Sequence, residues 1–225
     1  MPALEGIKAC VFDAYGTLFD YNSAAERCRD ALGGKLDALN ALWRQKQLQY
    51  TWLRSLEGRH ADFWQVTGDA LDFALEALGL ADAALRQRLM ELYLTLDLFP
   101  DAADVLARLK SAGMRAAILS NGSPMMLDAA VARAGIGGLL EAVLSVEEVG
   151  IYKTHPSVYR LATDRLGLAA GAIAFLSSNG WDAHGAAAFG MRTLWCNRQG
   201  QPRERLPGTL AREIRSLAEL PALVL

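Results

Sequence analysis

The chain starts with a short apolar run and then changes to a long segment of helical periodicity. Ile7 and residues 9–12 have the continuous apolar character of a strand buried on both faces of a parallel sheet. The run ends at Asp13, and Gly16 follows where a turn is needed. Ligands of open α/β sheets bind beyond the carboxyl ends of the strands, so a carboxylate here can act as a nucleophile. The alternative is that Asp13 only caps the turn, as aspartate often does.

Residues 21–96 contain helical patterns and no convincing strand. Apolar residues at spacings of three and four, among them Leu39, Trp43 and Tyr50, predict an amphipathic helix. A second helix is expected from residue 61 or 62 to 78, ended by a glycine, and a third over 83–96. A helical subdomain inserted directly after the first strand is therefore predicted.

From Phe99 onward, strands and helices alternate. Strands are predicted over 115–119, 142–144, 173–176 and 192–195, with helices between them that end at glycines. This alternation indicates βαβ units and a parallel sheet. We predict an α/β fold with a Rossmann-like parallel sheet core formed by residues 1–20 and 97–225, and an inserted helical cap formed by residues 21–96. Residues 200–208 are predicted to form a polar loop, and 216–225 a closing helix.

Composition narrows the class of protein. The 225 residues, 52% hydrophobic and 21% charged, are sufficient for a large core. A formal net charge of −2 gives no electrostatic reason to expect nucleic acid or a membrane surface as a partner. We expect no signal peptide and no membrane span, because the amino-terminal residues are not strongly apolar and no run reaches 18 apolar residues. Three widely spaced cysteines are typical of reduced thiols in a cytoplasmic protein, not of a metal site.

Polar residues follow several of the predicted strands. Asp13 follows the first, Ser120-Asn121 another and residues 177–179 a third, while Lys153 lies in the loop after a fourth. One strand that ends in Ser-Asn is most often only a turn. Three such ends with a lysine and an aspartate on one edge of the sheet indicate a functional site.

These residues resemble a known family. The motifs Asp13-x-Tyr15-Gly16-Thr17, Ser120-Asn121-Gly122, Lys153 and residues 177–182 (SSNGWD) are similar to the four motifs of the haloacid dehalogenase superfamily. The runs 12–18, 43–48 and 118–122 resemble more narrowly the L-2-haloacid dehalogenases. The resemblance extends from about residue 7 to residue 222 and includes the helical cap.

The resemblance implies a two-step hydrolysis. A nucleophilic aspartate, matched by Asp13, displaces halide from C2 of a 2-halo acid, and water then hydrolyses the ester to a 2-hydroxy acid of inverted configuration. Lys153 matches the lysine that keeps this aspartate ionised. The residues that match those positioning the aspartate or the water are Thr17, Ser177, Asn179 and Asp182. Asp182 is expected to orient or activate the water, although a residue at this place could instead cap its helix.

The resemblance also implies how halide and substrate are bound. Arg44 matches the arginine that accepts the departing halide, a task suited to a permanently charged guanidinium; from periodicity alone it would face solvent. Asn121 and Trp181 are expected to complete the halide site, and Ser120 to hold the substrate carboxylate. The expected pocket wall comprises Tyr15, Gln45, Leu48, Phe63 and Trp181. Tyr159 matches a tyrosine near the active site, with a packing role as the alternative.

Position 15 distinguishes between activities within the superfamily. Phosphatase members resemble Asp-x-Asp, whose second aspartate protonates the leaving alkoxide, whereas this chain has Tyr15. Halide is a good leaving group that needs no general acid. The sequence therefore predicts hydrolysis of short L-2-haloalkanoic acids without metal or other cofactor, with a Mg²⁺-dependent small-metabolite phosphatase as the alternative. A catalytically silent binding protein is a third hypothesis, disfavoured because Asp13, Lys153, Arg44 and Asn179 are all present.

The resemblance also implies a homodimer, with 2-haloacid, water and halide as the small-molecule partners.

Two features depart from the family pattern. Thr154 stands where the family has a proline, which leaves the loop around Lys153 less constrained. The polar stretch 197–209 is unlike that of the relatives and is expected to alter the edge of the sheet.

Overall fold

The computed structural model describes residues 3–225, and its core is a six-stranded sheet. All of the neighbouring strands in this sheet run parallel, and the first strand of the chain lies between two later ones. The strand order is β5-β4-β1-β6-β7-β8. The strands are β1 (Ala9–Phe12), β4 (Arg115–Ser120), β5 (Ala142–Ser145), β6 (Ile173–Ser177), β7 (Arg192–Cys196) and β8 (Arg212–Ile214).

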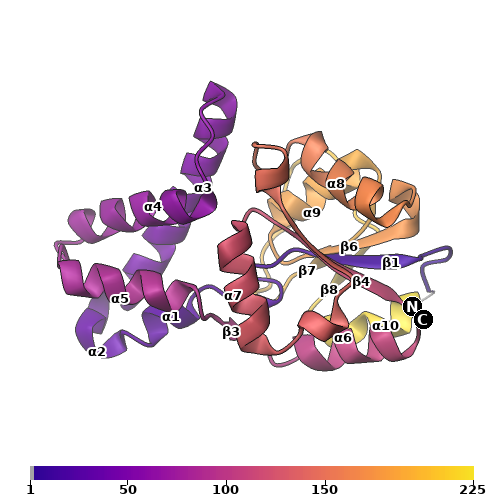
Figure 1. Cartoon of the computed structure of the whole chain (residues 1–225), viewed down its shortest axis with the longest axis horizontal. Helices are drawn as coiled ribbons and strands as arrows, with labels where there is room; N and C mark the ends of the chain where they lie inside the picture. Colours follow the sequence, from indigo (N-terminus) through magenta and orange to yellow (C-terminus); the bar gives the residue numbers. More distant parts are fainter. Residues whose placement is uncertain (1–2) are drawn as a thin grey trace.

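Helices cover both faces of this sheet, as βαβ connections require (Figure 1). Helices α8 and α9 lie on one face and α6, α7 and α10 on the other. Their bounds are α6 (Ala102–Ser111), α7 (Pro124–Ala134), α8 (Pro156–Leu166), α9 (Gly180–Phe189) and α10 (Pro221–Val224). Short 3₁₀ turns occur at Gly33–Lys35, Gly137–Leu139, Val146–Glu148, Ala170–Ala172 and Leu217–Glu219. The predicted α/β class with a parallel sheet is confirmed.

Five helices form a separate group beside the sheet (Figure 1), which we call the cap. They lie between β2 (Phe19–Asp20) and β3 (Asp97–Leu98), two short strands that pair antiparallel where the chain leaves and re-enters the core. The boundaries 20/21 and 96/97 stay a prediction, which this arrangement supports. The cap helices are α1 (Ser23–Glu26), α2 (Arg29–Leu32), α3 (Leu36–Glu57), α4 (Phe63–Ala77) and α5 (Ala83–Tyr93).

The long helix α3 packs against the rest of the cap through residues spaced four apart. Leu39, Trp43, Gln47 and Thr51 are all buried, because residues four apart share one face of a helix. The Trp43 indole N–H donates to the carbonyl of Thr67 in α4 at 2.9 Å. Two of these four side chains are polar, which is unusual for the buried face of an amphipathic helix.

The end of α3 and the loop after it contact the core. The Trp52 and Trp181 rings meet edge to face with their centroids 5.6 Å apart. His60 lies 2.8 Å from the Glu147 carboxylate, and the Tyr152 hydroxyl donates to a cap carbonyl, that of Ala61. These contacts hold the cap across the carboxyl edge of the sheet.

The carboxyl-terminal part of the chain differs from the expected pattern. β8 was not predicted, because a three-residue strand with two charged residues carries no hydrophobic signal. The expected helix over 216–225 is instead a 3₁₀ turn followed by α10, since Pro221 lacks a backbone N–H and begins a new helix. The expected helix over 83–96 ends at Tyr93.

The stretch 197–209, which is expected to differ from that of the relatives, joins β7 to β8 at this edge. Arg198 forms an ion pair with Asp101 at 2.9 Å and donates to the Thr17 carbonyl at 3.0 Å. The stretch therefore contacts the loop that follows the first strand. The three cysteines are buried and form no disulfide, and within residues 3–225 no helix is long and apolar enough to cross a membrane.

Candidate active site

The parallel register brings the predicted polar residues to one edge of the sheet. Phe12, the last residue of β1, lies beside Ile118 of β4 and Leu176 of β6. Asp13 is therefore level with the ends of both neighbouring strands, and Ser120 and Ser177 are the last residues of those strands. The Asp13 backbone N–H donates to the carbonyl of Leu176 at 2.8 Å, which fixes the carboxylate on a rigid element.

The two oxygens of the buried Asp13 carboxylate have different surroundings. Oδ1 accepts one hydrogen bond, from the Lys153 ammonium at 3.0 Å. Oδ2 accepts from Asn179 at 2.8 Å, from Thr17 at 3.1 Å and from Ser177 at 3.4 Å. One oxygen is thus surrounded by neutral donors, and the other carries the ion pair.

Lys153 lies between two carboxylates in the protein interior. Its ammonium is 3.0 Å from Asp13 and 2.7 Å from Asp182, and only 1% of its side chain is exposed. Burial by itself would lower the pKa of Lys153, but the two carboxylates outweigh this effect and raise it above its usual value. Lys153 therefore stays protonated at neutral pH and offsets part of the buried negative charge.

Asp182 is completely buried in the first turn of α9. Its Oδ2 accepts from Lys153, and its Oδ1 accepts from the Tyr159 hydroxyl at 2.8 Å. Burial raises the pKa of Asp182, the Lys153 ammonium lowers it, and the Asp13 carboxylate raises it again, giving a value of about 6. Both carboxylate oxygens thus bond side chains of the site and do not cap the helix. Tyr159 therefore lies beside the site, and its ring also packs edge to face on Phe175.

The loop that carries Lys153 is held in place by neighbouring groups. The backbone N–H of Lys153 donates to the side-chain oxygen of Asn121 at 3.1 Å, and the peptide bond from Lys153 to Thr154 is cis. A Cβ at Gly185 would lie 2.5 Å from the Tyr159 hydroxyl and 2.7 Å from the Thr154 methyl group. Only glycine allows this close approach, so Thr154, which is otherwise exposed, packs directly against α9 at Gly185.

Arg44 reaches from the cap toward the core. Nη2 donates to Oδ1 of Asn179 at 3.1 Å, and Nη1 donates to Oε1 of Gln47 at 2.7 Å. The guanidinium also lies over the Tyr21 ring, 4.7 Å from its centroid. The Arg44 side chain is half-buried, and Asn179 connects it to the Asp13 carboxylate. It therefore does not face solvent, whereas periodicity alone indicates that it would.

The expected wall residues have different positions. The Tyr15 ring is buried beside Phe63, with centroids 5.6 Å apart, and its hydroxyl lies close to Gly122 without a hydrogen-bond partner among the described residues. Leu48 and Trp181 are half-buried, whereas Gln45 is exposed on the outer side of α3. The expected carboxylate-binding Ser120 accepts from the backbone N–H of Gly122 at 3.0 Å and so forms the turn beside Tyr15.

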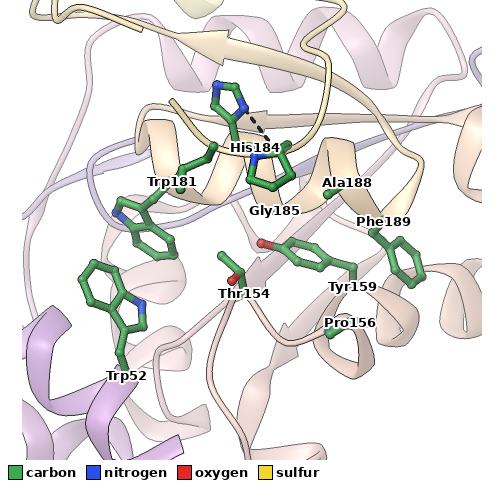
Figure 2. Close-up of a pocket in the computed structure, with 11 residues that line it drawn as sticks. Trp52, Thr154, Pro156, Tyr159, Trp181, His184, Gly185, Ala188 and Phe189 are labelled. Atoms are coloured by element: carbon green, nitrogen blue, oxygen red, sulfur yellow. Dashed lines mark hydrogen bonds between the residues drawn. The ribbon is translucent and has the colours of Figure 1, made fainter. Parts of the chain in front are cut away.

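A pocket of about 480 Å³ adjoins this cluster (Figure 2). Figure 2 shows the Trp52 and Trp181 rings at one end and Tyr159 with Phe189 at the other. A second pocket, of about 330 Å³, is lined by Gly16, Asn179 and the stretch after β7. The first is mainly apolar, and the second exposes more polar atoms and borders the loop that carries the nucleophile.

The sequence gives no role to Gln47, Thr67 or Tyr93, which the structure places behind Arg44. The Gln47 side chain is buried and contacts Arg44, Thr67 and Tyr93. The available signal was a polar residue four positions after Trp43, on the face of the helix that should be apolar. In the part of the chain that the structure describes, no group of three or more His, Cys, Asp or Glu side chains could hold a metal ion.

Comparison with known proteins identifies the family. The sequence profile of the haloacid dehalogenase-like hydrolases matches residues 7–190. (S)-2-haloacid dehalogenase 1 of Pseudomonas sp. strain CBS-3 is 46% identical over 223 residues, which cover 99% of this chain and 98% of that protein. The chain belongs to the L-2-haloacid dehalogenases within that family. The family and the hydrolase class predicted from the motifs are thereby confirmed, and the phosphatase alternative is not favoured.

Two solved structures support this assignment. The crystal structure of a dehalogenase superposes with a TM-score of 0.96 at 47% identity, covering 98% of each chain. The L-2-haloacid dehalogenase from Xanthobacter autotrophicus, solved with chloropropionic acid covalently bound, gives a TM-score of 0.90 at 39% identity. That match covers 96% of this chain and 98% of the Xanthobacter protein.

Replacing Lys153 by methionine removes the cation and leaves two buried carboxylates. We expect the free energy of unfolding at pH 7 to fall by about 3 kcal/mol, because an unpaired buried charge is costly. Without the ammonium, the folded-state pKa of Asp182, which burial already raises, rises further above its unfolded value. Folding then takes up protons, so the variant gains stability as the pH falls from 8 toward 5.

Urea unfolding followed by circular dichroism at several pH values measures this effect. The exposed Lys8→Met variant serves as a control and should stay within about 0.5 kcal/mol of the wild type. A Lys153→Met deficit that is the same at pH 5.5 and pH 8 would contradict the assigned charge balance.

Proposed function

We propose that this protein hydrolyses short L-2-haloalkanoic acids to 2-hydroxy acids of inverted configuration through an ester on Asp13. The observation that carries the proposal is the unequal environment of the two Asp13 oxygens. One is paired with a single lysine and can attack carbon, and the other is surrounded by three neutral donors. This division suits a carboxylate that is first a nucleophile and then an ester to be hydrolysed.

In the first step, Oδ1 of Asp13 attacks C2 of the substrate from the side opposite the halogen. The new C–O bond forms as the carbon–halogen bond breaks, and the halide departs with the bonding electrons. Lys153 keeps the carboxylate ionised, and the rigid end of β1 holds it in place for attack. Inversion at C2 follows from attack on the opposite side.

Arg44 is proposed to receive the departing halide. Its guanidinium donates to Asn179, which in turn donates to the nucleophile, so the cation lies one residue away from the reacting carboxylate. A guanidinium keeps its charge at any working pH and stabilises the negative charge that forms on the leaving group. Asn121 and Trp181 remain proposed as further contacts of the halide.

In the second step, water attacks the carboxyl carbon of the Asp13 ester. Negative charge develops on Oδ2, where Thr17, Ser177 and Asn179 already provide hydrogen bonds, as donors in an oxyanion hole do. Asp182, with a pKa of about 6, is ionised at neutral pH and is proposed to take the proton of the water. The bond between the carboxyl carbon and Oδ1 then breaks, and the departing alkoxide takes the proton held by Asp182, which releases the 2-hydroxy acid. The second proton of the water passes to solvent as Asp13 returns to a carboxylate.

The substrate is proposed to lie between the end of β1 and the cap. Ser120 and nearby backbone N–H groups would hold its carboxylate, and Tyr15, Leu48, Phe63 and Trp181 would enclose its alkyl group. Tyr15 supports a dehalogenase over the phosphatase alternative, because burial raises the pKa of its hydroxyl well above the usual value and makes it a poor proton donor. Gln45 stays in the proposed wall with the least support, since it is exposed.

Halide release tests this proposal directly. With EDTA present, the wild type should release chloride from L-2-chloropropionate and not from the D enantiomer. Asp13→Asn should lower the rate by at least about a thousandfold, because the amide is not a nucleophile. The exposed Asp104→Asn variant on α6 should keep the wild-type rate. Phosphate release from p-nitrophenyl phosphate only in the presence of Mg²⁺, without chloride release, would refute the proposal.

We also propose that the protein acts in the cytoplasm as a homodimer. Three unpaired, buried cysteines support a reducing compartment. The end of α3 supports self-association, since three large apolar residues within two turns of it are exposed: Trp52, Leu53 and Leu56, with exposed fractions of 39%, 44% and 85%.

Sedimentation velocity tests the proposed assembly. The wild type should sediment with twice the mass of the chain, and the double variant Leu53→Glu/Leu56→Glu with the mass of one chain, because charges there oppose apolar contact. Met125→Glu, at an exposed apolar position on α7, should remain dimeric. A monomeric wild type, or a double variant that remains dimeric, would contradict the proposal.

A further inference from the structure

A directional hydrogen-bond chain connects the cap to the nucleophile. It begins at helix α4, where the Thr67 hydroxyl donates to the carbonyl of Phe63 at 2.6 Å. A hydroxyl has only one proton to donate, so the Thr67 oxygen must accept its other hydrogen bond. It accepts from Nε2 of Gln47 at 2.8 Å. Helix α4 thereby determines which way the Gln47 amide faces.

The opposite end of the chain imposes the same orientation. Arg44 can only donate, so the group that faces it must be the oxygen of Gln47, at 2.7 Å. Asp13 as a carboxylate can only accept, so Asn179 presents Nδ2 to Asp13 and Oδ1 to Arg44. With the Gln47 amide turned around, two donors would meet at Arg44. The donor pattern is therefore consistent from Thr67 to Asp13.

We propose that Gln47 is a positioning residue that directs the Arg44 guanidinium at Asn179 and the departing halide. This inference rests on the proposed function, in which Arg44 receives the halide. Gln47 is buried, with 1% exposure, and Thr67 is completely buried, so neither can exchange these hydrogen bonds for water. Because Gln47 is uncharged, it holds Arg44 without neutralising the charge that an anion needs.

Holding Arg44 in this way has a physical purpose. An arginine side chain has several rotatable bonds, and fixing it in advance removes part of the entropy cost of binding the anion. Tyr93 adds to the support, since its hydroxyl lies 3.1 Å from Nε2 of Gln47 and its ring is 5.7 Å from the Tyr15 ring. The cap thus supplies both the cation and the groups that orient it.

Bromide binding measures this role without turnover. Titration of the wild type with bromide, followed by quenching of tryptophan fluorescence, gives the halide dissociation constant. We expect Gln47→Leu and Gln47→Glu each to weaken bromide binding by about tenfold, the first by releasing Arg44 and the second by neutralising it. The exposed Gln49→Leu variant on the same helix should bind bromide like the wild type.

Kinetics separate positioning from a general effect on the fold. Both Gln47 variants should lower kcat for 2-chloropropionate more than for 2-bromopropionate, because chloride is the poorer leaving group and depends more on Arg44. KM should change little, since the substrate carboxylate is bound elsewhere. Thr67→Val should show the same losses more weakly. Thr67→Ser, which keeps the hydroxyl, should have wild-type bromide affinity and kcat. This second pair of variants also tests the inference if the Gln47 variants do not fold.

Three results would overturn the inference. They are a folded Gln47→Leu variant with wild-type bromide affinity, an equal loss of kcat for both substrates, and a wild type that binds no bromide. A different result would show that the proposed function is wrong while the inference about Gln47 holds. A wild type that binds bromide through Arg44 but releases no halide from any 2-haloacid would refute the dehalogenase activity and leave the positioning role of Gln47 in place.

Discussion

One buried lysine pairs with both carboxylates of the reaction centre. Two carboxylates, Asp13 and Asp182, lie at the edge of a parallel sheet with almost no exposure, and the Lys153 ammonium bonds both. Buried carboxylates of this kind are tolerated only when they are paired with a cation and accept hydrogen bonds. The neighbouring groups supply the remaining hydrogen bonds, from Thr17, Ser177 and Asn179 on one carboxylate and from Tyr159 on the other. The chemistry that we propose depends on this pairing of Lys153 with both carboxylates.

Most strands of the sheet could be predicted from the sequence, because each buried strand is a continuous apolar run. Continuous apolar runs such as residues 9–12, and helices ended by glycines, indicate a parallel sheet directly. The polar residues that follow the strands indicated an active site before any contact was known. β8 left no such signal, since three residues with two charges look like part of a loop. The order of the strands determines which strand ends lie together and therefore where the charged cluster forms. That order follows from the alternation of strands and helices along the chain.

The cap was harder to interpret, because its functional side chains lie on helices. Periodicity favours a solvent-facing Arg44 and gives no role to Gln47. In the structure Arg44 reaches Asn179 of the core, and Gln47 is buried inside the cap. The family resemblance identified Arg44, but the orientation of its side chain depends on contacts with α4 and with Asn179 that are distant in sequence. Gln45, beside Arg44 in the sequence, is exposed because successive helical residues point in different directions. Helical spacing shows which residues share a face, and tertiary contacts determine what that face meets.

The central claim is that an oxygen atom of Asp13 enters the product, and isotope labelling tests it most directly. In a single turnover with excess enzyme in ¹⁸O-labelled water, the first 2-hydroxy acid formed should carry the unlabelled Asp13 oxygen. The peptide that contains Asp13 should then gain one ¹⁸O atom, visible by mass spectrometry after proteolysis. Label in the product and none in the peptide would mean that water attacks the substrate directly, and would contradict the covalent mechanism.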